Sequence, residues 1–393
     1  MGANPFVKQY LMTAGPTPVP PRVQAALAEP VVYHRAPDFD ALFARVLERL
    51  RAVFQTGNDV MVFTASGTGA MESAVANLVR PGQPMLACAG GKFGERWIEL
   101  GEAFGADVVR HEPEWGARLD AADVDRLLAE NPAVEVVFAT HSETSTGVVH
   151  DVRALAEAAR ARDALLVVDA ISGLGAAELR QDEWGVDVVV AGSQKALMTP
   201  PGLGMVSASE RALEFAAARP GPPSSYYFDW QRTLAEVRKP APATPFTPAV
   251  SLVKALDVAL DLIAEEGLDN ALARHDLLAR ATRAGVRGMG LDVFGDPDER
   301  STVVTAVELP DSIDGGAVPR LLAERGIVAN GGQGPLKGRV VRIAHCGYFG
   351  AFDVLISLSG LELALRELGA DVELGGGVTA AQHVFAEAGV PVA

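Results

Sequence analysis

Short apolar runs alternate with segments of helical periodicity over about residues 40–220. The runs span residues 59–65, 84–89, 106–111, 134–140, 164–170 and 186–192. Each run is apolar at consecutive positions rather than at every second position, which is typical of strands buried between two layers of helices. We therefore predict an α/β fold in which helices cover both faces of a mostly parallel sheet.

The segment after the first run has the spacing of an amphipathic helix. Met71, Ala74, Val75 and Leu78 follow the i, i+3, i+4, i+7 spacing that places apolar side chains on one helix face. In folds of this kind, ligands bind where the carboxyl ends of the strands meet the N-termini of the helices. We therefore expect the functional site at that edge of the sheet.

The second half of the chain has a different pattern. Residues 216–249 are rich in proline, which disfavours long regular structure and indicates an excursion toward a second domain. Residues 250–266 have a helical pattern, residues 285–370 are typical of a smaller α+β unit, and the weak pattern after Gly375 favours a short appended helix. A length of 393 residues also favours two domains. We predict an N-terminal arm, a large domain, a small C-terminal domain and a tail, at residues 1–20, 21–249, 250–373 and 374–393.

Composition and charge narrow the class of partner. The formal net charge is −16, and an acidic chain repels phosphate backbones, so neither nucleic acid nor an anionic membrane is an expected partner. No apolar stretch reaches the ~20 residues of a membrane helix, and the N-terminal residues lack the pattern of a secretory signal. Cys88 and Cys346 lie far apart without a metal-binding spacing. We therefore expect a soluble, cytoplasmic protein without a metal site.

The first candidate for chemistry is the loop Ser66-Gly67-Thr68-Gly69. It follows a predicted strand and opens the predicted helix 70–79, so its free N–H groups and the helix dipole could bind a phosphate. It is not a Walker A loop, and Glu72 stands where a dinucleotide fingerprint has its third glycine. On this loop alone, a plain helix N-cap is an equally good interpretation.

Two further candidates follow later strands. Asp169 closes a buried run, and a protonated pyridine nitrogen would be a suitable partner for its carboxylate, although an Asp there could equally cap the next helix. Lys195 comes just past the last run, and its amine could form a Schiff base with an aldehyde, although a surface lysine is the simpler interpretation of it alone. A phosphate cradle, a pyridine partner and a Schiff-base lysine at one sheet edge together indicate pyridoxal 5′-phosphate.

These motifs resemble those of class V aminotransferases of PLP fold type I, and most of all the alanine–glyoxylate / serine–pyruvate group. The resemblance rests on Ser66-Gly67-Thr68, Val168-Asp169-Ala170 and Ser193-Gln194-Lys195, and further on residues 15–20, 34–37, 92–96, 140–147 and 341–343. It covers about residues 10–370. It implies transfer of an amino group from a small amino acid (alanine, serine or aspartate) to a short 2-oxo acid (glyoxylate or pyruvate).

The resemblance also implies how the cofactor is held. Lys195 would bind it as a Schiff base and then carry the proton, and Asp169 would pair with the pyridine nitrogen. The phosphate would lie on Ser66, Gly67 and Thr68, with a further contact from Gln194.

Further roles follow from the same resemblance. Phe93 would stack on the cofactor ring, Thr144 would lie near its 3′-oxygen, and Arg342 would hold the substrate carboxylate with its planar fork. Thr244 and Thr247 align loosely with residues that reach the phosphate of the neighbouring subunit. The implied assembly is a homodimer with shared active sites.

Two alternatives remain open. A cysteine desulfurase shares fold and cofactor, but its nucleophilic cysteine precedes the carboxylate-binding arginine, whereas Cys346 follows Arg342, so we interpret Cys346 as a packing residue. A non-catalytic, hydrogenase-associated homologue is the other alternative, and the lack of an iron–sulfur cysteine pattern disfavours it. We interpret the histidines at 34, 141 and 345 as structural, and Arg35 is the one candidate for a distal substrate carboxylate.

Overall fold

A seven-stranded sheet forms the centre of the larger unit of this computed structural model, which describes residues 8–219, 221–295 and 300–389. In spatial order its strands are β2 (Val60–Phe63), β10 (Gly204–Ala208), β9 (Val188–Gly192), β8 (Leu165–Asp169), β5 (Val136–Thr140), β3 (Pro84–Cys88) and β4 (Asp107–His111). Every neighbouring pair is parallel except the two pairs made by β10. Each of the six predicted runs contains one strand, so the predicted α/β class is confirmed.

Strand β10 is the element of this sheet that the hydrophobic pattern did not predict. It runs antiparallel to both β2 and β9 and is buried at all its positions. Its sequence, GMVSA, contains Gly204 and Ser207, so it lacks the continuous β-branched run of the other strands. Only its place between two neighbours gives it strand geometry.

Helices cover both faces of the sheet, as the continuous apolar runs predict. Leu166 and Val168 of β8 pack with α2 (Pro37–Phe54), α5 (Ala121–Glu130), α6 (Val152–Ala161) and α10 (Val250–Glu266). Leu165 and Val167, which point to the other face, pack with α3 (Gly67–Leu78), α4 (Lys92–Ala103), α8 (Glu210–Ala218) and α9 (Trp230–Val237). The short helix α9 lies within the proline-rich segment, where we had expected no long regular structure.

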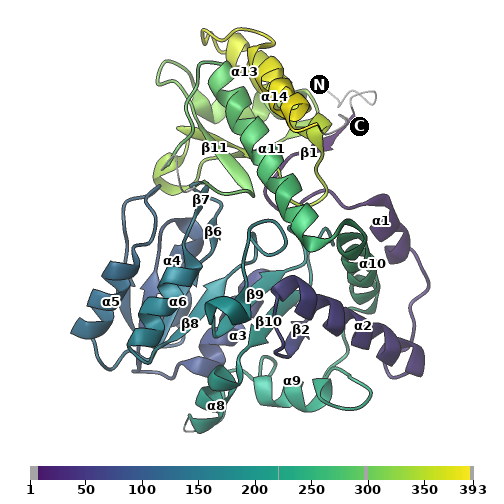
Figure 1. The fold of residues 1–393 in the computed structure, drawn as a ribbon, viewed down its shortest axis with the longest axis vertical. Helices are drawn as coiled ribbons and strands as arrows, with labels where there is room; N and C mark the ends of the chain where they lie inside the picture. The colour runs from purple at the N-terminus through teal and green to yellow at the C-terminus, as the bar shows by residue number, and fades with distance from the viewer. Residues whose placement is uncertain (1–7, 220, 296–299, 390–393) are drawn as a thin grey trace.

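The second unit surrounds a three-stranded antiparallel sheet and lies above the first in Figure 1. Its strands are β11 (Val304–Glu308), β14 (Val340–Ala344) and β13 (Asn330–Gly331), and its helices are α11 (Leu268–Gly288), α12 (Val318–Glu324), α13 (Ala351–Glu367) and α14 (Gly376–Glu387). Helix α14 confirms the appended helix expected after Gly375, and its Ala381 and Phe385 are buried in this unit's core. The shorter elements of the chain are β1 (Tyr10–Leu11), α1 (Pro21–Leu27), β6 (Ser142–Glu143), β7 (Val148–Val149), α7 (Gln181–Trp184) and β12 (Ile327–Val328), with 3₁₀ turns at Gly315–Ala317 and Gly334–Leu336.

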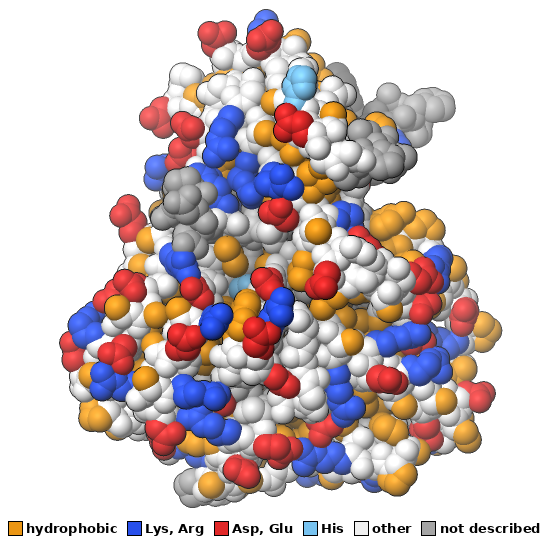
Figure 2. Space-filling view, in the orientation of Figure 1, with side chains coloured by type: hydrophobic (Ala, Val, Ile, Leu, Met, Phe, Trp, Pro, Cys, Tyr) orange, Lys and Arg blue, Asp and Glu red, His pale blue; other side chains and the backbone are white. Residues whose placement is uncertain are grey.

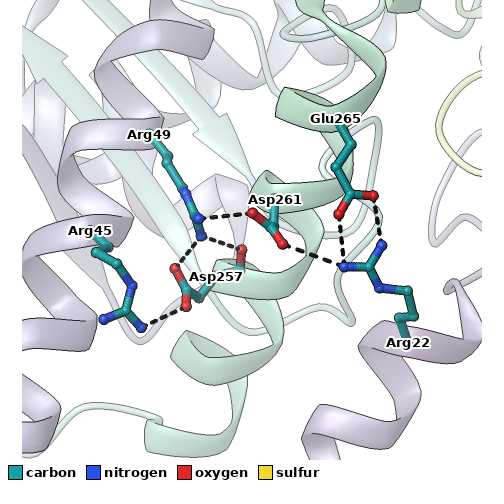
Figure 3. Close-up of polar contacts among 6 residues, drawn as sticks. All are labelled: Arg22, Arg45, Arg49, Asp257, Asp261 and Glu265. Carbon is teal, nitrogen blue, oxygen red and sulfur yellow. Dashed lines mark hydrogen bonds and ion pairs between the residues drawn. The ribbon is translucent and has the colours of Figure 1, made fainter.

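The N-terminal arm ties the two units together, and α10 is held on the first unit. The N-terminal strand β1 pairs in parallel with β12, and Met12 and Ala14 join the core of the second unit. Helix α10 contributes to the core of the first unit, and ion pairs link it to α1 and α2, as Figure 3 shows. The ion pairs join Arg22 to Asp261 and Glu265, Arg45 to Asp257, and Arg49 to Asp257 and Asp261. The domain boundaries given above stay predictions.

Acidic and basic side chains are interspersed over the face shown in Figure 2. Within the described ranges, none of the helices combines the length and the apolar character needed to cross a membrane.

Candidate active site

A cavity of about 290 Å³ lies at the carboxyl ends of the central strands. Seven of the residues predicted from the sequence line it: Ser66, Gly67, Thr68, Phe93, Asp169, Gln194 and Lys195. The other lining residues had no predicted role; they are Gly15, Pro16, Arg96, Ser142, Ile171, Ser172 and Pro201. Five strands and the N-terminal arm therefore converge on one site.

The N-terminus of α3 presents free backbone donors to this cavity. Ser66 is the N-cap residue, and its carbonyl accepts hydrogen bonds from the N–H groups of Gly69 and Ala70. The N–H groups of Gly67 and Thr68 have no acceptor among the described residues. A Cβ on Gly67 would lie 2.5 Å from Cδ1 of Ile171, so the close packing of Ile171 requires glycine here. The helix end is therefore suited to an anion.

Asp169, the last residue of β8, is 4% exposed. Its Oδ1 accepts a hydrogen bond of 2.8 Å from the N–H of Ile171, and its Oδ2 has no hydrogen-bond partner among the described residues. Burial raises the pKa of Asp169 from its ordinary 3.8 to about 7, although the bond from Ile171 opposes that change. The carboxylate therefore has an unused oxygen and favours a cationic partner.

This raised pKa makes the stability of the ligand-free protein depend on pH. The folded chain holds the Asp169 proton up to about pH 7, whereas the unfolded chain loses it near pH 3.8. The contribution of Asp169 is therefore fully present below the lower value and is lost as pH rises to the upper one, by on the order of 4 kcal/mol at most. Asp169→Asn stays neutral, so its free energy of unfolding should rise relative to wild type between these two pH values. Urea titrations of both ligand-free proteins measure this difference, and a constant difference across that range would contradict the expectation.

Lys195 lies in the loop after β9 and is 9% exposed. Its Nζ donates a hydrogen bond of 2.5 Å to the carbonyl of Ala14, and a Cβ on Gly15 would collide with the lysine side chain. Gly15 has a φ of +142°, a backbone conformation that side chains rarely adopt, so glycine is required on both counts. Burial lowers the pKa of Lys195, while Asp169 raises it. The N-terminal arm therefore closes one side of the cavity over the amine.

Thr17 of the same arm fixes the lysine loop. Its N–H donates to the carbonyl of Gln194 at 3.1 Å, and its Oγ1 donates to the carbonyl of Lys195 at 2.9 Å. Residues 15–20 are part of the resemblance described for the sequence, but no local pattern indicates that they contact the loop of Lys195, far away in the chain.

Phe93 and Arg96, both on α4, form another part of the cavity lining. The Nζ of Lys195 lies 6.0 Å from the centroid of the Phe93 ring, and Cζ of Arg96 lies 5.2 Å from it. Arg96 has no ion pair among the described residues, so the cavity holds two cationic side chains and one carboxylate, Asp169. This balance suits an anionic ligand.

Thr144 and Arg342 lie together but are not among the residues that line the cavity. Both are buried, and Nη1 of Arg342 donates to the carbonyl of Thr144 at 2.9 Å. Nε of Arg342 donates to the carbonyl of Gly331 at 3.0 Å, which leaves Nη2 without a partner in the described part of the chain. Arg342 lowers the pKa of Lys195, in keeping with a position near the amine.

Thr244 and Thr247 are not brought to the cavity of their own chain. Thr244 is buried, and its Oγ1 donates to the carbonyl of Phe246 at 2.7 Å. Thr247 is exposed and lines a separate pocket beside Val31, Tyr33 and His34. A role at the phosphate in their own chain is therefore excluded by this geometry.

His345 and Cys346 are both buried away from solvent, among residues that explain them as parts of the packed interior. His345 is buried between the carbonyl of Thr302 and the hydroxyl of Thr305. Cys346 is buried in the core of the second unit, and burial raises the pKa of its thiol to about 11, so it lacks the exposed thiolate of a nucleophile. No group of three or more His, Cys, Asp or Glu side chains that could hold a metal occurs in the described ranges.

Comparisons with known proteins agree over nearly the whole chain. The family model of Aminotransferase class-V matches residues 9–343. The serine–glyoxylate aminotransferase of Arabidopsis thaliana is 37% identical, across 95% of this chain and 94% of that protein. The soluble hydrogenase 42 kDa subunit of Anabaena cylindrica is 39% identical, across 96% of this chain and 99% of that protein. The crystal structure of ureidoglycine–glyoxylate aminotransferase from Bacillus subtilis has a TM-score of 0.92 at 35% identity and covers 96% of this chain and 98% of that chain.

Proposed function

The chain belongs to the class-V aminotransferases and depends on pyridoxal phosphate, and we propose that it transfers the amino group of alanine, serine or aspartate to glyoxylate or pyruvate. The observation that carries this proposal is the convergence of Lys195, Asp169 and the free N–H groups of α3 on one cavity. The relatives whose names include glyoxylate support a short 2-oxo acid as acceptor.

The residues of the cavity fit the cofactor. Gly67 and Thr68 offer two unused N–H groups to its phosphate, and Oδ2 of Asp169 is free to accept a hydrogen bond from its ring nitrogen. The cationic Arg96 adds to the favourable field for an anion. Phe93 supplies an aromatic surface beside Lys195, in keeping with a stacking role.

When bound, pyridoxal phosphate supplies an electron sink that stabilises negative charge at the substrate carbon bearing the amino group. Asp169, as a carboxylate, would stabilise positive charge at the ring nitrogen. Lys195 would hold the cofactor through its Nζ and would carry the proton, and burial lowers the pKa of this amine, which favours its neutral form. The arm over Lys195 limits access of water to the amine.

Arg342 is proposed to bind the substrate carboxylate, because its Nη2 has no partner in the described chain while Nε and Nη1 hold the guanidinium in place. Arg342→Lys should raise KM for the amino acid about 10- to 100-fold, since a lysine loses the charge-assisted bonds of the planar fork. kcat should fall less than KM rises. Steady-state kinetics measure both constants, and Arg320→Lys, on the exposed side of α12, should change neither. An unchanged KM in Arg342→Lys would exclude this role.

A single-turnover screen tests the substrate assignment. Purified holoenzyme is mixed with each amino donor in the absence of an acceptor, and the released 2-oxo acid is quantified. We expect an amount equal to the enzyme sites with at least one of alanine, serine and aspartate, and continued turnover when glyoxylate or pyruvate is added. Release from none of the three would contradict the proposal. Sulfide release from cysteine, abolished by Cys346→Ala, would instead support the desulfurase alternative.

We also propose a cytoplasmic homodimer with shared active sites. Thr244 and Thr247 do not reach the cavity of their own chain, and Val31 and Tyr33 beside Thr247 are 71% and 67% exposed. Exposed apolar side chains of this size favour contact with a second copy. Sedimentation equilibrium of the holoenzyme measures the mass, and a monomer would contradict a shared site.

A further inference from the structure

Glu143 is a fully buried carboxylate in β6, just beyond the strand that ends at Thr140. Its Oε2 accepts hydrogen bonds from the N–H groups of Phe93 and Gly94, at 3.0 and 2.9 Å. Its Oε1 accepts from the N–H and the Oγ of Ser145, at 3.0 and 2.6 Å. No ion pair with a Lys or Arg side chain is present for it in the described ranges. Burial raises the pKa of Glu143 and the bonds from these four donors lower it, so the donors favour the carboxylate form in the absence of a direct cationic partner in the described ranges.

The carboxylate caps the helix that carries Phe93. The N-cap residue of α4 is Gly91, which offers no side chain, and the N–H groups of the first turn are bound instead by Glu143 and by Oγ of Ser145, which accepts from Lys92 at 3.0 Å. A Cβ on Gly91 would lie 2.6 Å from Cγ of Glu143, so the glycine lets the carboxylate approach the helix end. The position of Phe93 in the cavity wall therefore depends on a residue 50 positions away.

The other oxygen of the same carboxylate fixes the turn that holds Arg342. The bonds from Ser145 close residues 143–145 into a tight turn, and the carbonyl of Thr144 in this turn accepts from Nη1 of Arg342. Burial lowers the pKa of Arg342 and raises the pKa of Asp169; the negative charge of Glu143 opposes the first change and adds to the second. One buried group is thus linked to the aromatic wall, to the proposed carboxylate-binding arginine and to the buried aspartate.

We propose that Glu143 is a positioning residue for the transamination reaction: one carboxylate oxygen holds Phe93 in the cavity lining, and the other holds the turn that binds Arg342. This inference rests on the proposed roles of Phe93 and Arg342. An ordinary helix cap acts differently: Asp120 at α5 is exposed, accepts one N–H bond from Ala122, and belongs to a helix that contributes no residue to the cavity. Loss of such a cap lowers stability alone.

Glu143→Gln tests the proposal, because it keeps the shape but turns one acceptor oxygen into an NH₂ group that faces backbone donors. We expect the Kd for pyridoxal phosphate to rise about tenfold, KM for the amino acid to rise at least threefold, and the visible circular dichroism of the bound cofactor to change. Kd is measured by quenching of tryptophan fluorescence, and thermal unfolding of the cofactor-free protein is followed in parallel. Asp120→Asn is the matched control: it makes the same acid-to-amide change at a helix cap away from the cavity, and it should leave Kd, KM and the visible spectrum as in wild type.

The outcomes separate the two proposals. If wild-type protein binds no pyridoxal phosphate, the proposed function fails and this inference fails with it. If wild type binds the cofactor and turns over, but Glu143→Gln matches Asp120→Asn in Kd and KM, only the role of Glu143 is overturned. Should Glu143→Gln not fold, Ser145→Ala takes its place, since it removes the hydroxyl bonds to Oε1 and to Lys92 but keeps the carboxylate. It should raise Kd and KM about threefold, and values equal to wild type would overturn the proposal.

Discussion

Replacement of Lys195 by Ala is expected to lower turnover by on the order of 10⁴-fold or more, because one amine supplies both the covalent attachment and the proton transfer. Alanine should be tolerated by the fold, since the lysine side chain makes one hydrogen bond, to the carbonyl of Ala14, and its buried amine has a lowered pKa. Steady-state assays measure turnover, and circular dichroism measures folding. Borohydride reduction followed by peptide mass spectrometry should find the cofactor on the Lys195 peptide in wild type and on no peptide in the variant.

Lys254 offers a matched control for this experiment. It is also largely buried, and its Nζ bonds to Glu29 and to the carbonyl of Pro30 outside the cavity. Lys254→Ala should keep turnover within a few-fold of wild type. Normal turnover in Lys195→Ala would overturn the proposed mechanism, whatever the control does.

Asp169→Asn is expected to have the second-largest effect, a fall in kcat of about 10²- to 10³-fold, the usual size for loss of one preorganised charge in an active site. The amide keeps the shape and can still accept from the N–H of Ile171, but it carries no negative charge to hold a proton on the ring nitrogen. Protein reconstituted with excess pyridoxal phosphate is assayed, so that weaker cofactor binding and slower chemistry are measured separately.

Asp187→Asn is the matched control, because it removes the charge of a buried carboxylate that lies outside the cavity. Asp187 is 3% exposed, and it accepts from the N–H of Leu166 and from Nη1 of Arg211 without lining the cavity. Its variant should unfold at a lower temperature and keep its kcat. If Asp169→Asn retains wild-type kcat at saturating cofactor, Asp169 does not have the role proposed for it.

Some of the site could be predicted because the required information is local. Asp169 and Lys195 each follow a continuous apolar run, and residues at the carboxyl ends of parallel strands meet at one edge of the sheet. Ser66, Gly67 and Thr68 likewise combine a strand end with a helix start. Strand β10 was missed because its own residues carry no strong strand pattern, and its geometry comes from β2 and β9 on either side.

Other parts of the site depend on contacts between segments far apart in the chain. Lys195 and Ala14 are 181 positions apart, and Arg342 and Thr144 are 198 apart, so no local periodicity reports either contact. Arg96 belongs to residues 92–96, which carried the resemblance, but only the fold shows that it has no acidic ion-pair partner among the described residues. Thr247 was assigned by a loose motif match to the phosphate of the neighbouring subunit; the single chain leaves it exposed in another pocket, so that assignment stays a prediction.

The amino-acid sequence by itself determined the α/β class, the order of the six buried runs and the edge where Lys195 and Asp169 meet. It could do so because hydrophobic periodicity and strand ends are properties of neighbouring residues. Only the tertiary structure decided that the arm closes over Lys195, that β10 completes the sheet, and that the Glu143 carboxylate joins Phe93 to the turn holding Arg342. These features arise when distant backbone groups must satisfy their hydrogen bonds inside a shared core, and that requirement has no signature in any single stretch of sequence.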